Sequence, residues 1–223
     1  RDGLIVLAWA ALPALCLLWL NRTGPYDFVL LRCVLVWVMA CFIGRYRSWQ
    51  LSLEVVTLIS MLAVIGFHLI VPDVSKFWVQ QLAPQIEEFA ANTSWRLTAL
   101  DVKGWIDRMS PAIAGMYAFG FLIGVLIVMI VSRWWQSSIF SPGGFKEEFI
   151  RIRMGRAAAI AVLVVSLGIM IKIKVCLGLL PVLLLPFVIA GLSFVHYLAA
   201  QKDGMRIMLV IVYMGIIFIP LAV

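Results

Sequence analysis

Charged residues are scarce in this chain. Asp, Glu, Lys and Arg make up only 13% of its 223 residues, whereas soluble domains carry about 25%. Hydrophobic residues make up 64%, and the mean hydropathy is +1.07. This composition excludes an ordinary soluble domain, and the apolar runs lack the alternation of a membrane β-barrel. The sequence therefore predicts an all-α, polytopic transmembrane helical bundle in contact with membrane lipids.

The motifs of several enzyme classes are also missing. The chain contains no P-loop, no HExxH and no GxSxG, so it lacks the phosphate loop, the zinc helix and the nucleophile elbow that those motifs build. Its cysteines show no CxxC or zinc spacing and lie within apolar segments: Cys16, Cys33, Cys41 and Cys176. We therefore predict no catalytic residue, no cofactor and no metal, and expect a protein that is not an enzyme.

The formal net charge is +7, but the basic residues sit in short loops between apolar runs. In such loops they meet anionic lipid head groups, at about 1 kcal/mol each. This placement indicates a membrane surface as the partner and excludes a nucleic acid.

Seven apolar segments approach the length of about 20 residues that a helix needs to cross a bilayer. They are residues 4–20, 28–43, 51–71, 111–131, 157–171, 175–200 and 205–222. Pro111 suits the first turn of its segment, so we expect a helix to begin there. Arg1 is not an initiator residue, and we expect the natural beginning of the chain, with further spans, to lie upstream.

The polar region 72–110 separates the third segment from the fourth. Trp78, Leu82, Ile86 and Phe89 recur in it at helical spacing, which predicts an amphipathic helix lying on the membrane. Its charges nearly balance, which favours the extracytoplasmic side. The region is too long for a simple connector. It is a lid over a substrate cavity, a docking surface, or a helical cap that rests on the bilayer.

A basic turn lies between the fourth and fifth segments, at residues 141–156. Pro142, Gly143 and Gly144 signal a turn. We expect a short surface helix after it, with Glu147 and Glu148 in the first turn, where the helix dipole favours carboxylates. Arginines follow towards the expected end of that helix: Arg151, Arg153 and Arg156. The positive excess predicts a cytoplasmic location, where these arginines contact lipid head groups or dock a partner.

Four polar side chains inside the apolar segments are candidates for a substrate cavity. They are Arg32, His68, Ser193 and His196. Arg32 either snorkels to the interface or faces a cavity and binds an anion. Pro181 and Pro186 interrupt the segment that carries Ser193 and His196. Such breaks occur in transporter binding sites and in kinked packing helices.

Small residues spaced four apart predict close helix contacts. Ala10 and Ala14 form one such face, and Gly120 and Gly124 form a literal GxxxG. The partner helix lies either inside this bundle or in another subunit.

Two stretches of the second half carry a resemblance to a known family. They are Ser141-Pro142-Gly143-Gly144-Phe145-Lys146-Glu147-Glu148-Phe149, followed by Arg151-Ile152-Arg153, and Gly191-Leu192-Ser193-Phe194-Val195-His196-Tyr197. The chain resembles the YybS-like family of bacterial polytopic membrane proteins. That family is distantly similar to the substrate-binding S components of energy-coupling-factor transporters. The resemblance implies a small helical bundle that docks on a membrane partner, with Ala10 and Ala14 as the docking face.

Two functions follow as expectations. The first is a small-molecule transport or substrate-binding subunit of the bacterial inner membrane, resembling an S component. The alternative is a non-catalytic scaffold or accessory subunit of a larger inner-membrane complex. The sequence leaves the substrate, the partner subunits and the oligomeric state open.

Overall fold

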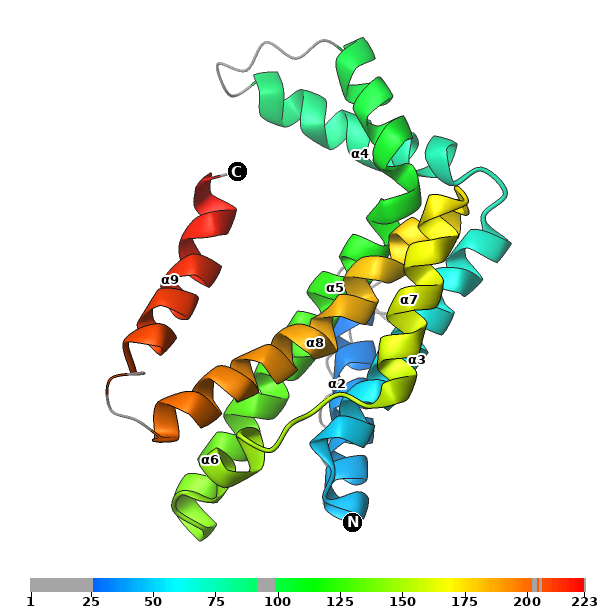
Figure 1. Cartoon of the computed structure of the whole chain (residues 1–223). Coiled ribbons are helices and arrows are strands. Elements are labelled where there is room, and N and C mark those ends of the chain that lie inside the picture. Colours follow the sequence, from blue (N-terminus) through cyan, green and yellow to red (C-terminus); the bar gives the residue numbers. More distant parts are fainter. Residues whose placement is uncertain (1–25, 92–98, 202–203, 205, 223) are drawn as a thin grey trace.

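A computed structural model of the chain describes residues 26–91, 99–201, 204 and 206–222 (Figure 1). All regular elements within these residues are helices, which confirms that the fold is all-α. They are α2 (Tyr26–Tyr46), α3 (Trp49–Ile70), α4 (Val74–Ala91), α5 (Ala99–Phe140), α6 (Gly144–Phe149), α7 (Arg156–Met170), α8 (Lys174–Gln201) and α9 (Arg206–Ala222). The predicted segment 4–20, with Ala10 and Ala14, lies outside the described residues.

Three of the described helices are long and apolar enough to cross a membrane. They are Trp49–Ile70, Val102–Phe140 and Lys174–Gln201. Helix α7 is apolar but has only 15 residues, fewer than the about 20 that a bilayer core requires. Helices α2 and α9 coincide with the predicted segments 28–43 and 205–222. The three long helices indicate a membrane protein, and the prediction of seven spans is not confirmed.

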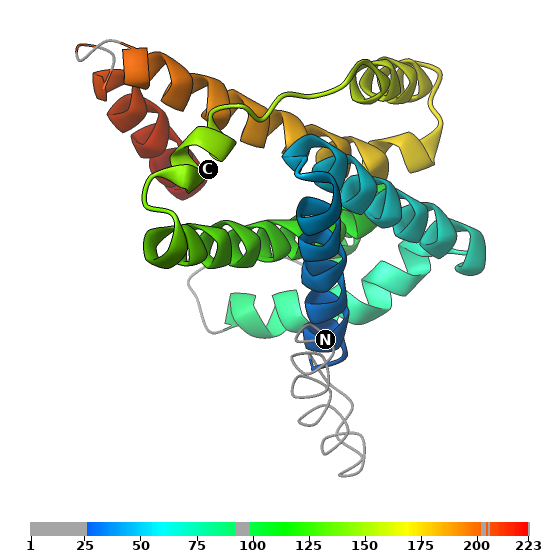
Figure 2. The same ribbon diagram turned by 90° about the horizontal axis from the view of Figure 1, so that it is seen from below.

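The core forms where α3, α5 and α8 cross, and α2 packs beside α3 and α5 (Figures 1 and 2). The closest approach joins Gly115 of α5 to Gly178 of α8. A methyl group built on Gly115 would overlap the Gly178 carbonyl oxygen, and one built on Gly178 would lie 2.7 Å from the Pro111 carbonyl oxygen. Only hydrogen fits between the two backbones, so these glycines set the distance between α5 and α8.

Helix α5 runs through Pro111, which corrects the expectation that a helix begins there. Proline lacks the N–H that would bond to the carbonyl four residues earlier, here that of Asp107. The Ser110 hydroxyl donates to the Asp107 carbonyl oxygen at 2.9 Å and replaces the missing donor. The first turns of α5 therefore join the span directly, and Figure 1 shows α5 bending in its upper part.

Within the region 72–110 the structure describes two helical stretches, α4 and the first turns of α5. Helix α4 is amphipathic, as predicted, with Trp78 and Ala83 buried and Gln81 and Gln85 exposed. Its apolar side packs on α5, and the Trp78 ring stacks on Tyr117 at 5.2 Å. Contacts with α5 thus bury much of the face that was expected to rest on the bilayer.

Helix α6 confirms a short helix in the basic turn, but it ends at Phe149. The arginines expected at its end lie elsewhere: Arg151 and Arg153 are in the connection to α7, and Arg156 begins α7. The Ser193 hydroxyl of α8 donates to the Phe149 carbonyl oxygen at 2.6 Å. Glu54 of α3 accepts the Gly155 N–H at 3.1 Å. These two bonds hold the connection against the bundle.

Large apolar side chains face outward along α7 and α9. Leu163 and Leu167 of α7 and Ile207 and Ile211 of α9 are each 60% exposed or more. Helix α9 has α8 as its main neighbour, and Figure 1 shows it diverging from the other helices. Such surfaces suit contact with lipid tails or with a further helix.

Candidate functional site

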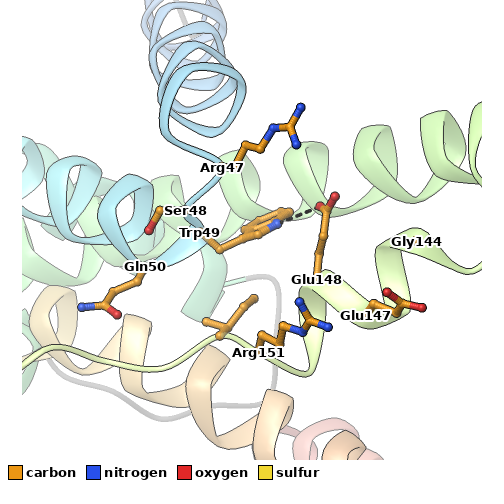
Figure 3. Close-up of a pocket in the computed structure, with 9 residues that line it drawn as sticks. Arg47, Ser48, Trp49, Gln50, Gly144, Glu147, Glu148 and Arg151 are labelled. Atoms are coloured by element: carbon orange, nitrogen blue, oxygen red, sulfur yellow. Dashed lines mark hydrogen bonds between the residues drawn. The ribbon is translucent and has the colours of Figure 1, made fainter.

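A hollow lies at the end of the bundle that carries α6 and the α2–α3 turn (Figure 3). Its volume is about 380 Å³, which falls within the range of small-molecule sites. Two short segments, 47–50 and 144–152, supply its lining: Arg47, Ser48, Trp49, Gln50, Gly144, Glu147, Glu148, Arg151 and Ile152. The site therefore joins parts of the sequence about one hundred residues apart.

The α2–α3 turn presents two of these side chains. Arg47 has φ of 50°, a left-handed conformation that ends α2 sharply. Ser48 caps α3, because its hydroxyl oxygen accepts the Leu51 N–H at 3.2 Å. This capped turn leaves Arg47 exposed while it buries Trp49, which is 6% exposed.

Glu148 connects the two segments. Its carboxylate accepts the Nε–H of Arg133 at 3.0 Å and the indole N–H of Trp49 at 3.3 Å. A second bond from Arg133 Nη2 completes an ion pair. The bonds from Arg133, and then the weaker one from Trp49, lower the pKa of Glu148 below its ordinary value, against the opposing effect of burial. The ionised Glu148 side chain therefore links α6 to α3 and α5.

Two arginines of the pocket form no described ion pair, although the charge of Arg47 also contributes to lowering the pKa of Glu148. Arg47 and Arg151 are exposed, and neither forms an ion pair with any residue that the structure describes. In Figure 3 they flank Trp49 from opposite sides. The charged residues of the lining are two arginines and two glutamates, which sum to zero. Arg133 lies outside the lining and pairs with Glu148, so the sum with Arg133 included is one positive charge, which suits an anion.

Arg32, the first of the predicted cavity residues, lies between α2 and α5. Its Cζ is 5.2 Å from the centre of the Phe121 ring, and a methyl group built on Gly124 would lie 2.9 Å from the same Cζ. The Arg32 Nε is buried and has no hydrogen-bond partner in the described part of the chain. The guanidinium is therefore half-buried between two apolar helices, with one N–H that no described acceptor satisfies.

The other three predicted cavity residues bond mainly within the protein. The Nδ1 of His68 contacts the Val64 carbonyl at 2.9 Å, while its Nε2 is buried without a described partner. His196 contacts the Leu192 carbonyl at 2.8 Å and the Tyr213 hydroxyl at 3.4 Å. Ser193 is fully buried, and its hydroxyl donates to the Phe149 carbonyl oxygen. The structure does not bring these residues together with Arg32 at a described pocket.

The two glycines of the GxxxG have different surroundings. Gly124 receives the Arg32 side chain, so it contacts α2 inside the bundle. Gly120 is exposed, and a methyl group built on it would meet nothing within 4 Å. The tight crossing lies instead at Gly115 and Gly178, which the sequence analysis did not select because neither belongs to a four-residue glycine repeat.

Arg151 is the one member of the predicted basic cluster that lines the pocket; Arg153 and Arg156 are exposed beside it. The sequence analysis missed Arg47, Trp49 and Glu148 as one site. A tryptophan after a basic turn is a signal of an interface, but it does not specify a partner so distant in sequence.

Among the described residues, no group of three or more His, Cys, Asp or Glu side chains could hold a metal ion. No model of a known protein family matches the chain, and no curated protein or solved structure matches it either.

Proposed function

We propose that this chain is a transport-type membrane subunit that binds a small anionic solute at Arg32. The observation that carries the proposal is the buried Arg32 Nε, which lacks a described partner between α2 and α5. Charged side chains within membrane helices are costly, and they commonly mark the path of a substrate or ion. A carboxylate or phosphate of a solute would supply the missing charge and acceptor.

The depth of Arg32 supports a solute rather than a surface contact. Its neighbours Phe121 and Gly124 lie two to three turns before Arg133 on α5, which places them about 14–18 Å from the level of the pocket. A bilayer core is about 30 Å thick, so Arg32 would lie well inside it. The Phe121 ring face attracts the guanidinium but offers no acceptor for the buried Nε–H.

The proposal also includes a cellular location and a class of membrane protein, both of which the sequence resemblance implies. We place the chain in a bacterial inner membrane, as a multi-pass binding subunit similar to an S component. The three helices that are long and apolar enough to cross a membrane support the membrane part of this proposal, and Arg32 supports the binding part.

The test is native mass spectrometry of the full chain purified in nanodiscs. The wild type should carry a stoichiometric anionic small molecule, Arg32→Gln should lose it, and Arg32→Lys should retain part of it. Arg108→Gln is a matched control, because Arg108 is exposed and its described hydrogen bond is to the Gly104 carbonyl of its own helix. If Arg32→Gln keeps the small molecule, or only lipid travels with the wild type, Arg32 is not a solute site.

A second candidate function is an accessory subunit of a larger membrane assembly. The outward apolar side chains of α9 favour it, since α8 is the main described neighbour of that helix. Cross-linking in intact membranes from a cysteine at Ile211 should then capture another membrane protein at a defined ratio. Capture of lipid alone would leave α9 as an ordinary lipid-facing helix.

A further inference from the structure

We infer that the pocket between the α2–α3 turn and α6 is a separate binding site for a phosphate-bearing anion, held by Arg47 and Arg151. This inference does not depend on the proposed function, because Arg32 is not one of the residues that line the pocket. The two sites can therefore be tested in the same protein with different variants.

Charge is the first argument. Arg47 and Arg151 form no described ion pair, whereas Glu148 is already bonded to Arg133 and Trp49. A guanidinium presents paired N–H donors that match two oxygens of a phosphate. Two such groups on opposite sides of one hollow can share a single phosphate, which offers more oxygens than a carboxylate does.

The lining also suits the group that carries the phosphate. Trp49 and Ile152 are buried apolar residues at the pocket wall, at 6% and 4% exposure. Trp49 is the first residue of α3, one of the helices long enough to cross a membrane. The pocket therefore lies at the N-terminus of that helix. Tryptophan and arginine together are typical of the head-group level of a bilayer. A phospholipid head group and a soluble phosphate compound share the chemistry that this site recognises.

Binding would join two distant segments. Arg47 begins the α2–α3 turn and Arg151 lies in the α6–α7 connection. A ligand held by both residues stabilises the folded state over the unfolded one, so it should raise the melting temperature of the protein.

The first experiment compares two double variants of the full chain in nanodiscs. Arg47→Gln/Arg151→Gln removes the proposed pair. Arg45→Gln/Arg153→Gln makes the same charge change two residues away from each of these positions, at arginines that do not line the pocket. Titration with phosphatidylglycerol should show a loss of affinity of at least about tenfold for the first pair and a much smaller loss for the second. Equal losses would mean general attraction to a basic surface, and would overturn the inference.

The second experiment uses the unmodified protein, so it does not depend on how the variants fold. Phenylglyoxal labels accessible arginines, and peptide mapping reports each site. Vesicles of phosphatidylcholine with phosphatidylglycerol should protect Arg47 and Arg151 but not Arg153, relative to phosphatidylcholine alone. Protection by inorganic phosphate as well would identify a soluble phosphate compound as the ligand, and protection by the lipid alone would identify a head group. If neither probe protects the pair, the pocket is not a phosphate site.

Discussion

Replacing Gly115 by alanine should separate α5 from α8. The added methyl group would overlap the Gly178 carbonyl oxygen, and its next nearest neighbours are also backbone atoms of Gly178. No side chain can rotate to make room, so the helices themselves must move apart. Overpacking of this kind costs about 1–3 kcal/mol, and we expect the upper end of that range because these contacts are all with backbone.

Gly120→Ala is the matched control in the same helix, since nothing lies within 4 Å of a methyl group built there. Alanine favours a helix over glycine by about 1 kcal/mol, and this gain is common to both variants. Their difference therefore isolates the crossing contact.

The assay is thermal unfolding in one detergent, monitored by circular dichroism. A difference of about 3 kcal/mol corresponds to about 6–12 °C for a chain of this size, so Gly115→Ala should melt that much below Gly120→Ala. If the two variants melt together, the close approach of α5 to α8 at Gly115 is not part of the folded protein.

Two further predictions concern the polar end of the bundle. Ser193→Ala leaves the Phe149 carbonyl without its donor and should cost about 1–3 kcal/mol in thermal unfolding, whereas Ser138→Ala, at an exposed site, should change little; equal melting would contradict the buried bond. The pKa of Glu148 is lowered from 4.5, so its stabilising contribution is present above pH 4.5 and is lost as the pH falls through the lowered value. Because the pair is partly exposed, Glu148→Gln should cost about 1 kcal/mol at pH 7 and remove part of the acid sensitivity, while a similar effect of Glu147→Gln would count against the pairing.

The structure also shows how a predicted helix boundary failed. Pro111 is a favourable first residue of a helix, and the sequence rule for proline predicts a start there. The rule considers the proline alone. Here the Ser110 hydroxyl satisfies the Asp107 carbonyl that proline leaves free, and the buried side chains of Val102 and Ile106 hold the preceding turns against the bundle. Packing and one side-chain bond thus extend α5 beyond its predicted beginning.

The sequence by itself determined what depends on composition and local period. Apolar runs of sufficient length predicted the helices at 51–71 and 175–200, and the spacing of Trp78, Leu82 and Ile86 predicted an amphipathic α4. These features are local, because a residue three or four positions away lies on the same helix face. The tertiary structure alone decided which glycines meet at the crossing, and it brought Arg47 to Arg151 around one pocket. Those contacts depend on how the helices cross, and the spacing of residues within one segment does not predict that crossing.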